Sequence, residues 1–466
     1  MKSTLLRLAL WASAACVLPL AAPAADLTEI YHRALRNDPQ LREAEANHMA
    51  SLEARPQALS ALLPQIGGTA GYVHDELNQT APFYNGTSFS PLSTLTKGDS
   101  KSWGLTLTQT LFRWDKFASL KQSDAKVAQA EIDYRAAQQD LIVRTATAYF
   151  NVLAAHDTLE AAEASREAIS RQLEQAEKRF EVGLIAITDV EEAKAANDQA
   201  IATVIADKRL LATARDQLRE VTGDSFDELV RPGDDMPLIS PDPSSEEQWV
   251  KAALDQNLPL SSARLAAEIA HEQISIARAG HAPTLDLIAK RTGSNTSATE
   301  GYTDPVSGMP FSFPADVTTN DKQIALQLTV PIYSGGYASS KVREAVYRHR
   351  AAREHLETTA RATERQTRDS YLGVISEISR VQALRQALES SKTALAATEA
   401  GYEVGTRTAV DVLLARQRLF DAQTNYARSR YDYVLNVLTL EQAAGTLDES
   451  RVTRVNGWLG QPVSVK

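Results

Sequence analysis

Side chains that commonly do chemistry are sparse in this chain of 466 residues. There is one cysteine, Cys16, and the eight histidines are scattered. No His-Glu-x-x-His, Gly-x-Ser-x-Gly or phosphate-loop pattern occurs. His349 and His355 are six residues apart on an expected basic helix, which is an unsuitable spacing for ligands of one metal ion. We therefore expect no enzyme activity, no cofactor and no metal site.

The N-terminal segment has the features of an export signal. Two cations precede an apolar run over residues 8–20, and the Ala-Pro-Ala sequence at 22–24 supplies the small residues that a signal peptidase requires. We predict a cleaved signal peptide over residues 1–24, which leaves an exported protein without cysteine. An uncleaved anchor is disfavoured because the run is shorter than about 20 residues. Lipidation at Cys16 is a further alternative.

The charge balance argues against a nucleic-acid partner. Lys and Arg number 49 against 59 for Asp and Glu, so the net charge is -10. A broad basic surface is therefore not expected. Mean hydropathy is -0.28, which excludes a bundle of membrane helices.

The exported part consists of two related halves. Three short segments and two single residues, Pro64 and Gly223, of the first half recur in the second, in the same order and about 220 residues later. We expect two structural repeats, residues 25–223 and 246–445. An acidic, proline-rich linker at 224–245 joins them and should be irregular, and a tail follows at 446–466.

Long helices should make up most of each repeat. Residues 26–63 predict one helix of about 35 residues. Heptads rich in Ala, Leu and Val run through residues 115–222 and 340–444 and predict supercoiled helices. Each of these two segments contains a glycine, Gly183 or Gly405, whose backbone freedom lets the chain fold back into a hairpin.

Alternation of apolar and polar residues predicts two strands in each repeat. The expected strands are residues 65–78, 101–112, 284–292 and 322–333. Segments rich in Gly, Ser and Thr, at 79–100 and 293–320, should be long loops. Long loops at one end and aromatic residues at the other are typical of outer-membrane strands, and a soluble sandwich is the alternative. The fold class is thus mainly α with a β part.

Four strands are too few to close a barrel. An open sheet edge is not tolerated in lipid, because its backbone groups would have no hydrogen-bond partners. If the strands enter a membrane, several copies of the chain must therefore share one barrel.

Two related phrases carry a family resemblance. They are Val-Gly-Leu-Ile-Ala-Ile-Thr-Asp-Val at 182–190 and Gly-Tyr-Glu-Val-Gly-Thr-Arg-Thr-Ala-Val-Asp-Val at 401–412. Together with the duplication and the export signal, they resemble the TolC family of outer-membrane efflux and secretion channels. The resemblance implies a homotrimer whose twelve strands form one transmembrane barrel, continued by a periplasmic α-helical barrel. It also implies that the linker and the tail form an equatorial belt.

The resemblance further implies a gate at the periplasmic tips of the helices. Thr188 and Asp189 of the first tip would face Tyr402 and Arg407 of the second, through a phenol hydrogen bond and a guanidinium contact. The alternatives are a capping role for Asp189 and a purely packed ring for Tyr402.

Asp411 matches a family position that lines the constriction. Copies of this carboxylate would form an acidic ring that attracts cations. A further acidic position of the family falls on Leu414 here, so we expect weaker cation selectivity. A first-turn role at its helix is the alternative for Asp411.

An adaptor protein is expected to dock on both helical tips. The expected docking residues are Val182, Gly183, Leu184, Val404, Gly405 and Thr406. The resemblance implies a passive exit duct in the outer membrane that extends into the periplasm. It would work with this periplasmic adaptor and an inner-membrane exporter, either ABC-type or proton-driven, in drug efflux, type I protein secretion or both. A periplasmic coiled-coil adaptor or structural protein without a barrel is the alternative.

Overall fold

The computed structural model describes residues 24–84, 86–233, 235–304 and 307–465. Residues 1–23 of the expected signal peptide, with Cys16, lie outside this description. The described chain divides into two compact units, and both repeats contribute to each. We call residues 24–42, 137–257 and 364–465 the helical unit, and residues 43–136 and 258–363 the sheet unit.

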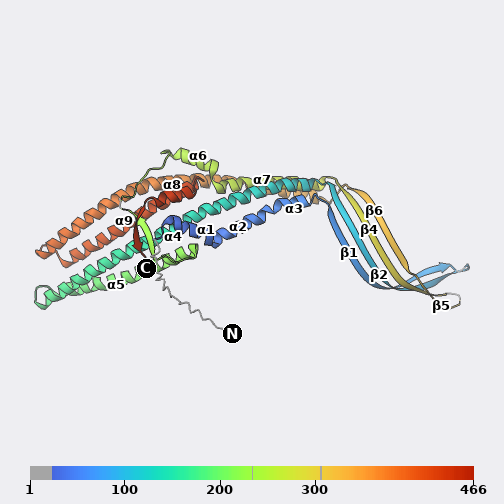
Figure 1. Ribbon diagram of the computed structural model, residues 1–466, viewed down its shortest axis with the longest axis horizontal. Coiled ribbons are helices and arrows are strands. Elements are labelled where there is room, and N and C mark those ends of the chain that lie inside the picture. The colour runs from blue at the N-terminus through green and yellow to red at the C-terminus, as the bar shows by residue number, and fades with distance from the viewer. Residues whose placement is uncertain (1–23, 85, 234, 305–306, 466) are drawn as a thin grey trace, which may run out of the picture. The chain divides into compact units, whose positions relative to one another are not determined.

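The sheet unit is built on one antiparallel sheet. Its strands are β1 (Gln65–Tyr84), β2 (Phe89–Phe112), β4 (Thr284–Thr303), β5 (Pro310–Pro314) and β6 (Val317–Thr329). β2 pairs with β1 and β4, and β4 pairs on its other side with β5 and β6, so the long strands lie in the order β1-β2-β4-β6 (Figure 1). The central pairing of β2 with β4 joins the first repeat to the second.

The strands are much longer than the sequence indicated. The expected loops at 79–100 and 293–320 are largely strand, because β1 continues to Tyr84, β2 begins at Phe89 and β4 continues to Thr303. Thr is abundant in these segments and favours extended backbone, and each strand gains a paired neighbour along its length. The fourth strand ends early, at Thr329 instead of residue 333. Pro331 follows closely and has no N–H to donate to a ladder.

The predicted single helix over 26–63 is wrong. Three helices occupy it, α1 (Leu27–Asn37), α2 (Pro39–Leu52) and α3 (Ala54–Ser60). The first break is at Asp38, which is extended at ψ 120° because a residue before proline is disfavoured in helical backbone. The Asp38 carboxylate then accepts from the backbone N–H of Leu41 at 2.7 Å and from Arg144 at 2.9 Å. Repeat two also breaks, at Asn257, between α6 (Glu246–Gln256) and α7 (Leu258–Arg278). Asn257 leaves the helical conformation at ψ 126°, although the proline, Pro259, here follows one position later.

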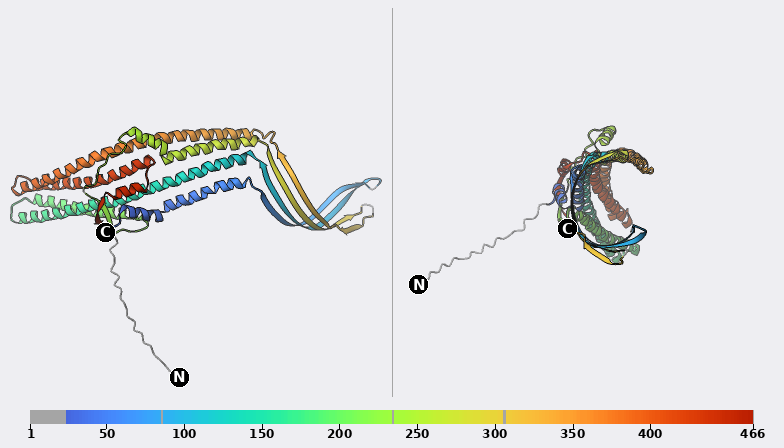
Figure 2. Two further views of the ribbon diagram at one scale, coloured as in Figure 1. Left: turned by 45° about the horizontal axis from the view of Figure 1, so that its top comes forward. Right: turned by 90° about the vertical axis from the view of Figure 1, so that its right-hand side faces the viewer.

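Two long helical hairpins supply most of the helical unit. The first is α4 (Trp114–Glu181) with α5 (Ile187–Thr222), and the second is α8 (Tyr337–Glu403) with α9 (Ala409–Ala443). Figure 2 shows α5 alongside α4 and α9 alongside α8. Large side chains fill the unit away from the hairpin ends, and Tyr149, Phe150, Leu153, Tyr433 and Leu438 are fully buried there.

The linker is more ordered than its composition indicated. It contains β3 (Glu228–Pro232), which pairs antiparallel with β7 (Leu459–Ser464) of the tail, after α10 (Glu449–Asn456). The sequence signal was weak because the partner strand lies more than two hundred residues away. Ala25 also joins this sheet, since its backbone N–H donates to the Glu228 carbonyl at 3.0 Å.

Within the residues that the structure describes, no helix combines the length and the apolar character needed to cross a membrane.

Candidate functional site

The ends of the two hairpins are the candidate site. In the first, α4 ends at Glu181 and Gly183 adopts a left-handed conformation with φ 75°. The amide of Gly183 donates to the Phe180 carbonyl, and that of Leu184 donates to the Arg179 carbonyl, both at 2.8 Å. These bonds satisfy the last carbonyls of α4 and reverse the chain, which is the role of a glycine after a helix. The sequence phrase around Gly183 therefore codes for the turn.

The second hairpin turns in the same way and has an additional cap. Gly405 has φ 79°, and the amide of Thr406 donates to the Gly401 carbonyl at 2.8 Å. The Thr408 hydroxyl accepts from the Asp411 amide, while the Asp411 carboxylate accepts from the Thr408 amide at 2.9 Å. This reciprocal pair is a capping box at the start of α9. The equivalent position in the first tip is Ala186, which has no capping side chain.

Apolar side chains at both turns point into solvent. Val182, Leu184 and Val404 are 70%, 73% and 75% exposed, respectively. Gly183, Gly405 and Thr406 are also exposed. In this single chain, both expected docking sets therefore present free apolar surface at the turns.

Tyr402 contacts a residue that the sequence did not single out. Its ring packs against Leu395, Val412 and Ala415, as expected for a heptad seam. The guanidinium of Arg179, on the first hairpin, lies over the ring at 5.0 Å from its centroid. This cation–π contact joins α4 to α8 near the tips.

The other three predicted gate residues do not meet Tyr402 here. In the described part of this one chain, no hydrogen bond or ion pair links Thr188 or Asp189 to Tyr402 or Arg407. Arg407 is exposed, and its amide donates to the Gly401 carbonyl at 3.2 Å. Contacts between copies of the chain lie beyond a single chain, so the predicted gate stays a prediction.

The alternative role of Asp411 as a helix cap is observed. The backbone and hydroxyl hydrogen bonds from Thr408, with a smaller contribution from Arg407, hold the pKa of the Asp411 carboxyl below its usual value. Asp411 is thus ionised near neutral pH, as an acidic ring would require. Leu414, three residues on, is 52% exposed.

Further contacts that sequence reasoning missed connect the hairpins. The Gln172 side chain of the first hairpin donates to the Ala409 carbonyl of the second at 3.4 Å. Within the second hairpin, Arg416 of α9 forms an ion pair with Glu399 of α8. The position of Arg179, four residues before Gly183, would have placed it near the first tip from the sequence alone. Its partner Tyr402 is more than two hundred residues away, so only the fold could identify the pair.

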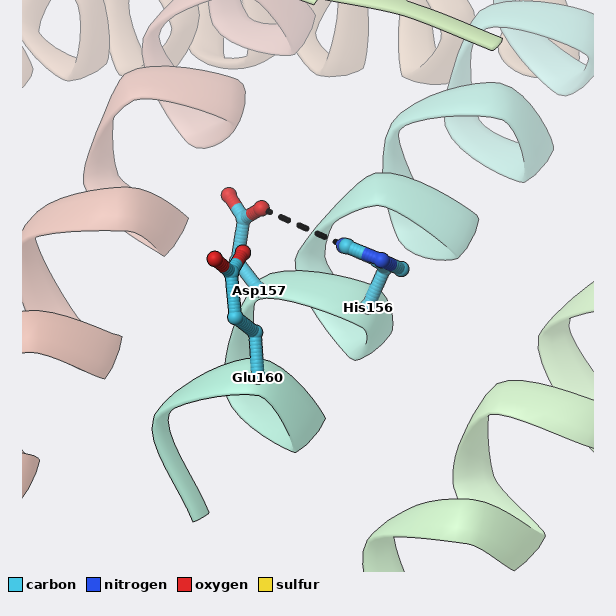
Figure 3. A group of neighbouring side chains, drawn as sticks. All are labelled: His156, Asp157 and Glu160. Atoms are coloured by element: carbon cyan, nitrogen blue, oxygen red, sulfur yellow. Dashed lines mark ion pairs between the residues drawn. The ribbon is translucent and has the colours of Figure 1, made fainter. Parts of the chain in front are cut away.

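One group of metal-ligating side chains occurs among the described residues, on a single turn of α4 in the helical unit. It consists of His156, Asp157 and Glu160, whose ligand atoms lie within 4.8 Å of one another (Figure 3). Arg231 approaches both carboxylates at 3.7 Å, and the Tyr431 hydroxyl donates to Asp157 at 2.6 Å. The protein thus supplies its own cation to these carboxylates, and we assign the group to an internal ion-pair network.

Comparison with known proteins defines the class to which this fold belongs. A family model described as "Outer membrane efflux protein" matches residues 30–224 and 249–446. The chain is 39% identical over 436 residues to "Outer membrane protein TolC" of Vibrio cholerae, covering 94% of each chain. It is 28% identical to "Alkaline protease secretion protein AprF" of Pseudomonas aeruginosa, over 96% of this chain and 90% of that one.

A solved structure shares the fold. The CmeC outer membrane channel of Campylobacter jejuni superposes with a TM-score of 0.72 at 19% identity, over 92% of this chain and 89% of that one. The duplicated protomer, mainly α with a β part, is thereby confirmed. The chain belongs to the TolC family of outer-membrane efflux and secretion channels.

Proposed function

We propose that this outer-membrane protein is a passive, gated exit duct. An inner-membrane exporter, ABC-type or proton-driven, would supply the energy, and a periplasmic adaptor protein would connect it to the duct. The proposed cargo class includes small molecules and secreted proteins, since the matching family model is described as an outer membrane efflux protein and one relative is named for secretion of an alkaline protease.

The observation that carries the proposal is the pair of unpaired sheet edges. In the described residues, β1 and β6 each pair on one side only, and every side chain of β1 is exposed. Because β1, β2, β4 and β6 alternate in direction, β6 of one copy can pair antiparallel with β1 of the next. Copies joined in this way form a closed ring without edges. The number three comes from the family, and gives twelve strands.

The proposed gate consists of contacts at the hairpin ends. Thr188 and Asp189 would meet Tyr402 and Arg407 across hairpins, and Asp411 would line the constriction. Each such contact contributes about 1–3 kcal/mol, so a partner that prefers the open tips can shift the population. The adaptor would dock on the two turns, where Val182, Leu184 and Val404 are exposed.

Export would begin with cleavage after Ala24. Ala25 is buried, and its backbone nitrogen bonds to Glu228, so this residue is already part of the helical unit. An N-terminal ammonium retains hydrogens for the same bond. This hydrogen bond supports our proposal that the mature N-terminus is Ala25. We also propose that the linker and the tail form an equatorial belt.

Planar bilayer recordings of the purified protein test this function. A trimer that conducts ions in discrete steps is expected, with low conductance in the resting state. The double variant Arg407→Ser with Tyr402→Phe should raise the single-channel conductance, because two gate contacts are removed. A monomer in detergent that never conducts would overturn the duct, while unchanged conductance of the variant would remove only these residues from the gate.

A further inference from the structure

The helical unit contains a cavity of about 300 Å³ that the channel function does not use. The linker at 239–242, α6, α8, α9 and α10 surround it, so its walls come from both the linker and the tail. Its volume is at the lower end of those that hold small molecules.

Three aromatic side chains, Trp249, Tyr433 and Trp458, line one part of the cavity. The Trp249 indole N–H donates to the Pro243 carbonyl at 2.7 Å. The Tyr433 hydroxyl accepts from the Ile239 amide at 2.8 Å and donates to its carbonyl at 3.0 Å. Trp458 stacks on Tyr433 at 6.3 Å between ring centroids. The polar atoms of Trp249 and Tyr433 are thus already engaged, so these two side chains contribute mainly apolar ring surface to the cavity.

The polar end of the cavity is different, because two buried atoms there have no partner. Glu441 is 6% exposed, and its Oε1 atom lies 3.3 Å from Arg451 and 3.5 Å from Arg454. Its second oxygen, Oε2, has no hydrogen-bond partner in the described chain, and neither has Nε of Arg451. A buried acceptor and a buried donor that both lack partners are costly. Both residues line the cavity.

We propose that this cavity is a binding site for a small, neutral amphiphile with an apolar body and a primary amide or similar polar end. The amide N–H would donate to Oε2 of Glu441, and the amide oxygen would accept from Nε of Arg451. The body would lie against Trp249, Tyr433 and Trp458.

The charges at the polar end favour a neutral ligand. A carboxylate has no hydrogen to donate to Oε2 of Glu441, so that acceptor would keep no partner. An ammonium group could donate to Glu441 but has no acceptor for Nε of Arg451, and it would lie close to two guanidinium groups. A primary amide satisfies the donor and the acceptor together without adding charge. This proposal does not rest on the channel function.

Ligand-observed fluorine NMR on the full mature protein in detergent tests the site. The probe is 4-fluorobenzamide, which should bind saturably with one site per chain. Three matched probes should each bind at least about tenfold more weakly, since one hydrogen bond or one charge is made unfavourable. They are N,N-dimethyl-4-fluorobenzamide, which has no N–H, 4-fluorobenzoate and 4-fluorobenzylamine.

A cavity-filling variant locates the binding. Val437 lines the cavity, and Val437→Phe should abolish binding of the amide probe. Val346→Phe, at an exposed position in the sheet unit, is the control and should bind as the unmodified protein does. Absence of saturable binding would mean a hydrated cavity only and would overturn the site, as would binding that persists in Val437→Phe. If that variant fails to fold, the order of the four probes decides alone.

Discussion

Asp189 and Asp411 occupy equivalent positions in the two repeats, but their helices begin differently. Asp411 exchanges hydrogen bonds with Thr408, whereas the residue equivalent to Thr408 is Ala186, which lacks a capping group. A side-chain cap is worth about 1 kcal/mol, so α9 should be held more firmly at its first turn than α5.

This difference predicts a pH effect confined to one tip. The folded-state pKa of Asp411 is lowered, so its contribution to the stability of the first turn is complete above the ordinary Asp pKa. It is lost as the pH falls through the lowered value. Amide hydrogen exchange, corrected for intrinsic rates, should show the start of α9 opening in acid. The start of α5 is the internal control, and equal opening of both would contradict the role of the cap.

The contact between Arg179 and Tyr402 predicts a second residue effect. Replacing Arg179 by Ala removes a cation–π contact worth about 0.5–2 kcal/mol between the hairpins, so resting conductance should increase. Lys178→Ala is the control, since Lys178 pairs with Glu174 on its own helix. If both variants conduct alike, Arg179 does not hold the tips together.

At the scale of elements, side-chain alternation and strand length relate the sheet to a membrane. Ile324, Leu326 and Leu328 alternate along β6 with polar or small residues and are strongly exposed in the single chain. β1 and β2 contain 20 and 24 residues, about twice the length that crosses a bilayer. The sheet should therefore extend well beyond the lipid on one side.

Alternation along β6 predicts opposite results for neighbouring substitutions. Leu326→Lys would place a charge on the lipid-facing side and cost about 2–4 kcal/mol near the membrane centre, so folding into vesicles should be impaired. Gln327→Lys, one residue on, faces the other side and should fold normally. The yield of heat-resistant trimer after refolding measures this, and equal yields would reject the assigned faces.

At the scale of the whole molecule, both units are made from both repeats. The pairing of β2 with β4, and of β3 with β7, ties segments together that are far apart in the sequence. Ala25 is tied to β3 by its hydrogen bond to the Glu228 carbonyl. A mature chain that begins at Ala25 could keep this bond.

The N-terminus gives a prediction at this scale. Intact mass of protein extracted from the outer membrane should correspond to a chain that begins at Ala25. Replacing Ala24 by a bulky residue such as Trp should slow processing, because signal peptidases require a small residue there. Recovery of the unmodified protein with Met1 retained would contradict cleavage.

The sequence by itself determined the duplication, the long heptad helices, both glycine turns and the presence of paired strands. Each of these follows from local periodicity or from backbone freedom at one residue. Tertiary structure alone decided how far the strands extend, that the linker forms a strand, and that Arg179 meets Tyr402. These features depend on partners distant in the sequence, whose hydrogen bonds and packing outweigh local propensity. The helix break at Asp38 depends on both. Pro39 marks the break in the sequence, whereas only the folded chain brings Arg144 to the Asp38 carboxylate.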